Sequence, residues 1–295
     1  MVEFLVNLVN GLSLGSVYAI IALGYTMVYG IAKMLNFAHG DVIMVGAYMS
    51  YVALRSLNLP PIVSMLVAMI VCTLLGMTIE KTAYKPLRMA TSLSVLITAI
   101  GVSYFLQNMA QLIWGATPVN FPADFITLPS LKLLDGQLTI EGTTLITIII
   151  GAVVMVGLTL FIGKTKMGKA MRAVSEDRGA AELMGINVNR TISITFAIGS
   201  ALAAIAGVLL WAKVFKLEPT TGALPGIKAF TAAVLGGIGS IPGAMLGGIL
   251  LGVIEIFGRA YISTALSDAI VFSLLIIVLL VRPTGLLGKP VREKV

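Results

Sequence analysis

Six long stretches of the sequence contain no Asp, Glu, Lys or Arg, and they constrain the fold more than any other feature. A bilayer core of about 30 Å needs about 20 apolar helical residues, so each stretch is long enough to cross it. Across the chain, 58% of the residues are hydrophobic and 11% are charged, which excludes a water-soluble enzyme. The sequence predicts an all-α, polytopic membrane protein. The stretches are 4–32, 56–79, 89–123, 142–163, 191–212 and 229–254.

Two further spans each contain an acidic residue near one end, where headgroups or neighbouring helices can solvate it. They are 34–54 with Asp41 and 260–281 with Asp268. The stretch 229–259 is interrupted, which favours two short passes or a re-entrant hairpin buried in protein. The interrupting residues are Gly236, Gly237, Gly239, Pro242 and Gly243. We therefore expect one transmembrane domain over 1–295, with about eight spanning helices plus this broken segment.

The loops between the predicted spans differ in basic charge. Of the 20 Lys and Arg residues, 14 fall in one alternating set of loops, and short cytoplasmic loops are the ones enriched in basic residues. This set is predicted to be cytoplasmic, with the N-terminus outside, the C-terminus inside and the loop 115–142 extracytoplasmic. Topology and anionic lipid account for the net charge of +7 without a nucleic-acid partner. The 14 basic residues of the predicted cytoplasmic set are Lys33 and those within 81–88, 164–190 and 282–294.

The sequence lacks the residue combinations that catalysis requires. Gly163-Lys164-Thr165 imitates the end of a phosphate-binding loop, but Leu158 stands where the first glycine is needed. His39 is the only histidine and Cys72 the only cysteine, so no Cys/His metal cluster can be built. We expect a protein that is not an enzyme and that itself binds no metal or cofactor.

The predicted cytoplasmic stretch 164–190 is too apolar to be a simple linker. Residues 175–178 offer caps and charge, and Gly185 suits a helix C-terminus. The pattern predicts two short helices, joined near Ser175, that dock on a cytoplasmic partner. The residues that can share one helical face are Ala170, Val174, Ala181 and Met184.

Six motifs follow one another along nearly the whole chain. They are ALGYTMVYG at 22–30, LNFAHGD at 35–41 followed by GAY at 46–48, GKAMRA at 168–173, AAELMGI at 180–186, GGIGSIPGA at 236–244 and RPTGLLG at 282–288. With these motifs the chain resembles the permease subunit of bacterial branched-chain amino acid ABC importers, of the hydrophobic amino acid transporter type. The second motif and the last two are the most specific.

The resemblance implies an assembly in the bacterial inner membrane. Its expected partners are a second, related permease that forms a heterodimer, two cytoplasmic ATPase subunits that bind ATP and Mg²⁺, and an extracytoplasmic substrate-binding protein. The segment 164–190 then carries the coupling helices. The importer pattern E-A-A-x-x-x-G is met only in part, because Gly179 stands in place of the acid and no I-x-L-P follows. The residues expected in this contact are Arg172, Ala173, Glu176, Asp177, Ala180, Ala181, Glu182 and Gly185.

Two alternatives stay open from the sequence. A self-sufficient secondary transporter or channel would use broken helices and a buried acid such as Glu255, although Glu255 and Arg259 are spaced for a local ion pair. Similar permeases import urea or short amides, which leaves the substrate open. Several polar residues in the apolar spans are candidates for the translocation pathway or for helix–helix hydrogen bonds. They are Asn36, His39, Asp41, Thr98, Ser103, Gln107 and Asn108.

Overall fold

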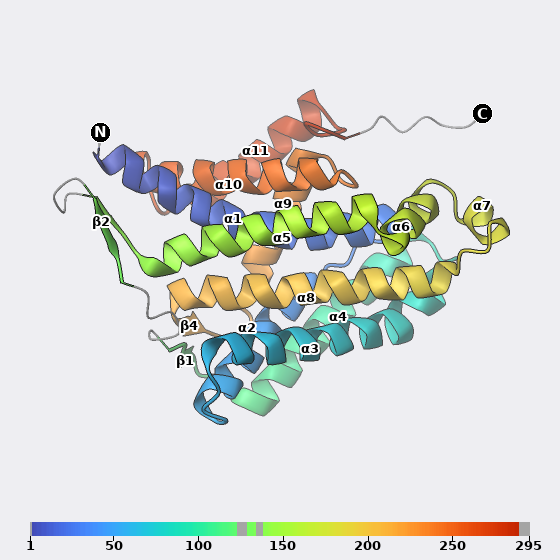
Figure 1. The fold of residues 1–295 in the computed structure, drawn as a ribbon, viewed down its shortest axis with the longest axis horizontal. Coiled ribbons are helices and arrows are strands. Elements are labelled where there is room, and N and C mark those ends of the chain that lie inside the picture. Colours follow the sequence, from blue (N-terminus) through green and yellow to red (C-terminus); the bar gives the residue numbers. More distant parts are fainter. Residues whose placement is uncertain (1, 123–128, 134–137, 289–295) are drawn as a thin grey trace.

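The computed structural model describes residues 2–122, 129–133 and 138–288. Most of its helices run along the long axis of the molecule (Figure 1). Within the described ranges, six helices are long and apolar enough to cross a membrane, which confirms the predicted all-α membrane class. They are α1 (Val2–Ala32), α3 (Pro61–Ile79, extended by a π-helical turn Glu80–Tyr84 and a 3₁₀ turn Lys85–Leu87), α4 (Ser92–Trp114), α5 (Gly142–Lys164), α8 (Val188–Val214) and α10 (Ile241–Tyr261).

Shorter helices complete the bundle. They are α2 (His39–Arg55), α6 (Lys166–Glu176), α7 (Arg178–Leu183), α9 (Ala223–Gly236) and α11 (Ser267–Val281). The predicted span 34–54 corresponds to α2, which begins later than expected because residues 33–38 leave the helical path. The predicted broken segment is two helices, α9 and α10, which pack against each other. With 14 residues, α9 is only about 21 Å long.

Local sequence sets many of the helix ends. Pro61 stands at the first turn of α3, where its missing N–H costs no hydrogen bond. Gly115 ends α4 with φ +86°, a conformation that favours glycine. Five side chains accept a hydrogen bond from a backbone N–H of the helix that follows them. These caps are Thr91, Thr165, Asp177, Asn187 and Ser240.

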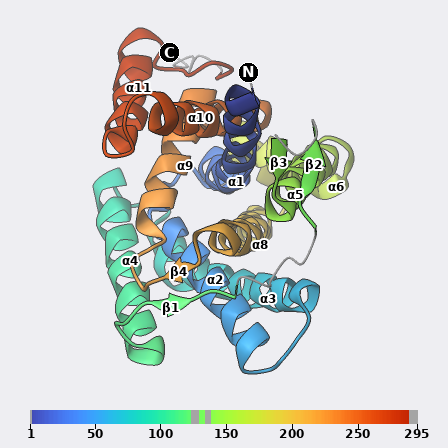
Figure 2. The same cartoon turned by 90° about the vertical axis from the view of Figure 1, so that its left-hand side faces the viewer.

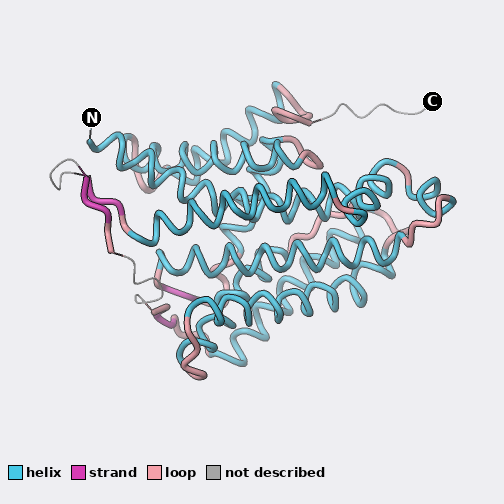
Figure 3. The backbone as a smooth tube through the Cα atoms, in the orientation of Figure 1, coloured by secondary structure: helices cyan, strands magenta, loops and turns pink. Residues whose placement is uncertain are grey.

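Short strands lie at one end of the molecule only (Figure 3). β1 (Val119–Asn120) pairs antiparallel with β4 (Lys216–Leu217), with Val119 opposite Leu217. β2 (Leu131–Leu133) and β3 (Leu138–Ile140) form a second antiparallel pair. Residues 123–128 and 134–137 of the predicted extracytoplasmic loop 115–142 lie outside the described residues, as do Lys289, Arg292 and Lys294 of the predicted basic tail.

Close packing of α1 against α10 forms one side of the core. A Cβ at Gly248 or Gly252 of α10 would overlap backbone atoms of Ala19 and Gly15 in α1. Small residues of this kind let membrane helices approach closely. Figure 2, which looks along most of the helices, shows α1 beside α10 and α8 beside α3. In this view α4, α5 and α11 lie at the periphery of the bundle.

The outward faces of the peripheral helices are apolar, as a lipid environment requires. Large hydrophobic side chains project there from four helices. They include Leu66, Ile70 and Leu74 of α3, Leu112 and Ile113 of α4, Val153, Val156 and Leu160 of α5, and Ile276 and Leu280 of α11. Together with the long apolar helices, these faces identify a multi-pass membrane protein.

Candidate translocation and coupling sites

A polar cluster surrounds the first turn of α2. Asp41 is buried, and its Oδ1 accepts a hydrogen bond of 2.9 Å from the Nε2 amide of Gln107 on α4. The same amide donates to Ser103 Oγ, one turn earlier, at 3.3 Å. A buried carboxylate without a donor is costly, so Gln107 stabilises Asp41 in this position. Three of the predicted pathway residues therefore meet between α2 and α4.

Asn36 lies in the connection between α1 and α2 and is buried. Its Oδ1 accepts a hydrogen bond of 2.8 Å from the hydroxyl of Tyr84. Tyr84 belongs to the π-helical turn that follows α3, a distortion that is frequent at functional sites. This bond joins the α1–α2 connection to the end of α3.

His39 opens α2 and is fully surrounded by protein. Its ring meets Tyr25 edge-on, with ring centroids 4.6 Å apart. A Cβ at Gly24 would lie 2.6 Å from His39 Nε2, so a side chain there would displace the His39 ring. Within the described residues Nε2 has no hydrogen-bond partner, and an unpaired buried nitrogen of this kind is uncommon.

The other two predicted pathway residues lie apart from this cluster. Asn108 is exposed, and its side chain donates to the carbonyl of Tyr104 on its own helix at 2.7 Å. Thr98 is half-buried on α4, about two and a half turns before Gln107. The polar residues of α4 therefore belong to separate environments.

A buried ion network connects four helices of the bundle. Glu255 of α10 is fully buried, and its carboxylate accepts from Lys228 Nζ of α9 at 2.7 Å and from Tyr18 of α1 at 2.8 Å. Lys228 also pairs with Asp268 of α11 at 2.6 Å. The predicted pair of Glu255 with Arg259 is present as well. Sequence spacing could indicate only this last pair, because the other partners come from different helices.

The glycine break between α9 and α10 is a tight turn. Gly237 and Gly239 have φ of +104° and +93°, and Ser240 caps α10, where Pro242 lies in the first turn. A Cβ at Gly236 would overlap the carbonyl of Gly243, and the reverse also holds. Gly236 and Gly243 thus pack closely, whereas no atom lies within 4 Å of a Cβ placed at Gly239.

The RPTGLLG motif closes over this break. The backbone N–H of Leu286 donates to the carbonyl of Leu235, and that of Leu287 donates to Gly236, each at 2.9 Å. Gly285 adopts φ +75°, and a Cβ there would lie 2.5 Å from Gly237 Cα. The two motifs begin at residues 236 and 282, which are 46 positions apart in the sequence. In the structure they form one unit.

The segment 164–190 contains the two expected short helices, α6 and α7, which project from the end of the molecule opposite the strands (Figure 1). Asp177 separates them and caps α7 through the N–H of Ala180 at 3.0 Å. Gly185 follows α7 with φ +78°. Ala181 is buried within the chain, whereas Leu183 and Met184 are 90% and 82% exposed. A partner would therefore meet Leu183 and Met184 before it met Ala181.

The remaining residues predicted to contact the ATPase lie on or beside this projection. Ala173 is half-buried, and the side chain of Arg172 donates to the carbonyl of Gly163 at 3.3 Å. The exposed members are Arg172, Glu176, Asp177, Ala180, Glu182 and Gly185.

Arg178 was not among the predicted site residues, although it links the projecting segment to the bundle. Its guanidinium donates to the carbonyl of Ala32, the last residue of α1. Nearby, Arg88 pairs with buried Glu80, which also accepts from Ser193 Oγ of α8 at 2.7 Å. No sequence spacing connects these residues, since they come from four separate segments.

Comparisons with known proteins agree with this architecture. A family described as "Branched-chain amino acid transport system / permease component" matches residues 7–279. The high-affinity branched-chain amino acid transport system permease protein BraD of Pseudomonas aeruginosa is 48% identical, covering 99% of this chain and 98% of that protein. LivH of Escherichia coli K12, of the same description, is 45% identical over the same shares.

A solved structure shares the fold alone. PsaBC from Streptococcus pneumoniae, in complex with Fab, matches with a TM-score of 0.51 and 15% sequence identity, covering 93% of this chain and 91% of that chain. The family match and the two relatives extend over nearly all of the chain. The chain therefore belongs to the family of permease components of branched-chain amino acid transport systems.

Proposed function

We propose that this chain is the permease subunit of an ATP-driven importer that moves branched-chain amino acids across the bacterial inner membrane. Its partners are a second, related permease, two cytoplasmic ATPase subunits and an extracytoplasmic binding protein. ATP and Mg²⁺ bind to the ATPase subunits, because this chain has no phosphate-binding loop.

The observation that carries the proposal is the projection formed by α6 and α7. Leu183 and Met184 are exposed apolar side chains at the tip of a segment with charged neighbours. Such side chains suit an interface in which a partner covers an apolar centre within a polar rim. Arg178, at the start of α7, connects the same segment to the end of α1, so movement of the projection reaches a spanning helix directly.

The ion-paired acids Glu255 and Asp268 give less support to a carrier that is driven by protons. Such a carrier needs ionisable groups that exchange protons along a pathway. Glu255 and Asp268 are both engaged by Lys228, and Glu255 is additionally paired with Arg259. These contacts lie at one place in the bundle and tie its helices together.

The proposal is tested by placing a charge on the projection. Leu183→Asp should bury an unpaired carboxylate in the ATPase contact, at a cost of roughly 1 to 3 kcal/mol. We expect the variant permease to reach normal levels in the membrane but to lose its ATPase subunits on purification, or to hydrolyse ATP without uptake. Leu57→Asp is the matched control, because Leu57 is also an exposed leucine, between α2 and α3. Normal co-purification and normal ATP-coupled uptake in Leu183→Asp would contradict the coupling assignment.

Ala181→Asp is a poorer probe of the same contact. Ala181 is only 3% exposed within this chain, so a carboxylate there would disturb the packing of α7 even without a partner. The exposed position of Leu183 avoids this ambiguity.

A further inference from the structure

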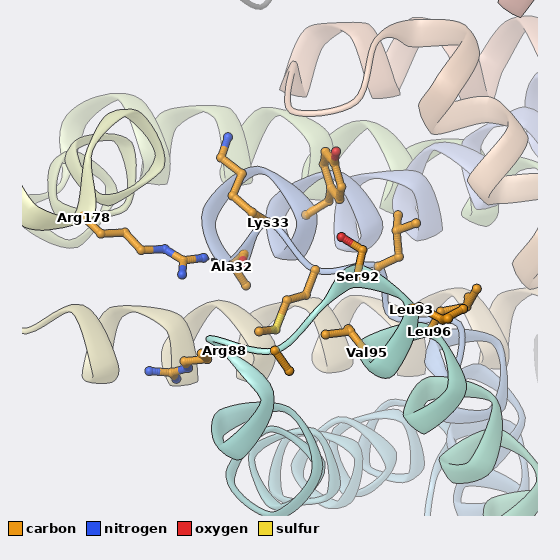
Figure 4. A pocket seen from close by; sticks show the side chains of 12 residues that line it. Ala32, Lys33, Arg88, Ser92, Leu93, Val95, Leu96 and Arg178 are labelled. Atoms are coloured by element: carbon orange, nitrogen blue, oxygen red, sulfur yellow. Dashed lines mark hydrogen bonds between the residues drawn. The ribbon is translucent and has the colours of Figure 1, made fainter. Parts of the chain in front are cut away.

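A cavity of about 560 Å³ lies where the end of α1 meets α7 and the start of α4 (Figure 4). Its size is within the range of small-molecule sites. Three cationic residues line it, Lys33, Arg88 and Arg178, together with apolar residues that include Leu35, Leu93 and Leu96. The cavity therefore combines positive charge with an apolar wall.

The two kinds of side chain are separated in space. In Figure 4, Arg178 and Arg88 lie toward one end of the cavity, and Leu93 and Leu96 lie toward the other. Lys33 lies between them at the end of α1, with its side chain exposed. A ligand that is anionic at one end and aliphatic at the other would match this arrangement.

The positive charge is only partly compensated. Arg88 is paired with Glu80, but Arg178 donates to a neutral carbonyl, that of Ala32. The pKa of Arg178 is lowered, first because burial removes water from the guanidinium and then because the positive charge of Arg88 is close. Lys33 adopts φ +53°, which is unusual for a residue other than glycine. A bound carboxylate would stabilise these charges.

A second, far smaller hollow lies beside the cavity. It shares Tyr29 and Leu35 with the cavity and is also lined by Asn36 and Phe230. The cavity borders the connection between α1 and α2, whose Asn36 is buried in the bundle. This position suits a transported molecule better than a lipid headgroup.

We propose that this cavity is a station on the inner side of the transport path, where an aliphatic amino acid rests before it is released. Its carboxylate faces Arg178 and Lys33, and its side chain faces Leu93 and Leu96. The ammonium group donates hydrogen bonds to the hydroxyl oxygens of Tyr29 and Ser92, which line the cavity, and is attracted by the partially negative carboxyl end of α1. The proposal rests on the proposed transport of branched-chain amino acids.

The test measures equilibrium binding of radiolabelled L-leucine to the purified complex of permeases and ATPases without the binding protein. Leucinol, which keeps the side chain and the amine but lacks the carboxylate, serves as competitor. We expect Lys33→Gln to weaken L-leucine binding roughly tenfold or more, as for a lost charged hydrogen bond, and to leave leucinol binding unchanged. Leu96→Trp should abolish binding by filling the cavity.

Matched controls separate this site from general effects. Lys85→Gln removes an exposed lysine near the same end of the bundle, and Ile97→Trp adds bulk to an exposed neighbour of Leu96 that does not line the cavity. Both should bind L-leucine as the unmodified protein does.

Unchanged L-leucine affinity in both Lys33→Gln and Leu96→Trp would show that the cavity is not a binding site for the substrate. If the unmodified complex still took up leucine, the proposed function would stand. If the unmodified complex took up no leucine, both the proposed function and this inference would be wrong. Native mass spectrometry in nanodiscs that contain phosphatidylglycerol tests whether the cavity binds a lipid instead. If Lys33→Gln released bound phosphatidylglycerol but left L-leucine affinity unchanged, the cavity would be a lipid site and the proposal would be wrong.

Discussion

At the scale of single residues, the energetic cost of a buried charge depends on its neighbours. Glu255 has no contact with solvent, yet Lys228, Arg259 and Tyr18 all donate to its carboxylate. Removing one partner from a buried ion pair leaves an uncompensated charge and typically costs several kcal/mol. The network is therefore expected to stabilise the contacts among α1, α9, α10 and α11.

We predict that Glu255→Gln destabilises the folded protein by about 3–5 kcal/mol, because it leaves Lys228 and Arg259 with less compensating charge. Adding Lys228→Met should recover part of the loss, since it removes one of the two cations. The measurement is the melting temperature of the purified permease in detergent.

The control for this prediction is Glu218→Gln, which breaks a more exposed pair with Lys216. Its expected effect is at most about 1 kcal/mol. Equal melting temperatures for Glu255→Gln and Glu218→Gln would show that the buried network does not stabilise the bundle.

At the scale of elements, the turn between α9 and α10 shows what sequence patterns can and cannot predict. The cluster of glycines with Pro242 correctly predicts a helix break, because glycine and proline both oppose a continuous helix. The same pattern does not reveal that residues 285–287 close over the turn, since this contact depends on how α11 returns to α9. Local chemistry is visible in the sequence, and long-range pairing is not.

The same distinction applies to the candidate sites. Asp41 and Gln107 could be chosen because polar residues stand out in apolar spans, but their hydrogen bond joins positions on different helices. Lys228 and Arg178 were missed because a basic residue near a span end is usually explained by topology. Only the packed structure shows that both make contacts within the bundle.

We predict that Gly243→Leu reduces assembly with the partner permease or abolishes transport, because its side chain would overlap the backbone of Gly236. Gly239→Leu should have a smaller effect, since no atom lies within 4 Å of its Cβ position and only the positive φ is unfavourable, at about 1–2 kcal/mol. Assembly is measured by size-exclusion chromatography and transport by uptake.

Leu250→Ile is the suitable control for the turn. Leu250 is 42% exposed, whereas the neighbouring Leu251 is fully buried, because α10 packs that face against other helices. Wild-type assembly and uptake in Gly243→Leu would refute the role of the turn.

At the scale of the whole molecule, β2 and α7 lie at opposite ends of the long axis (Figure 1). The basic residues of the loops predict that the α7 end is cytoplasmic. In a Cys72→Ala background, a cysteine at exposed Ser130 should react with an impermeant maleimide in intact cells. A cysteine at exposed Glu182 should react only after permeabilisation. The reverse pattern would invert the proposed topology.

The central claim, that an ATPase partner powers this permease, is tested most directly by uptake into proteoliposomes. The permease is reconstituted with its partner permease and ATPase subunits, with the binding protein and radiolabelled L-leucine outside and ATP with Mg²⁺ inside. We predict accumulation of leucine that requires both internal ATP and the ATPase subunits. Leucine uptake by the permease alone, driven by an imposed proton or sodium gradient without ATP, would contradict this account.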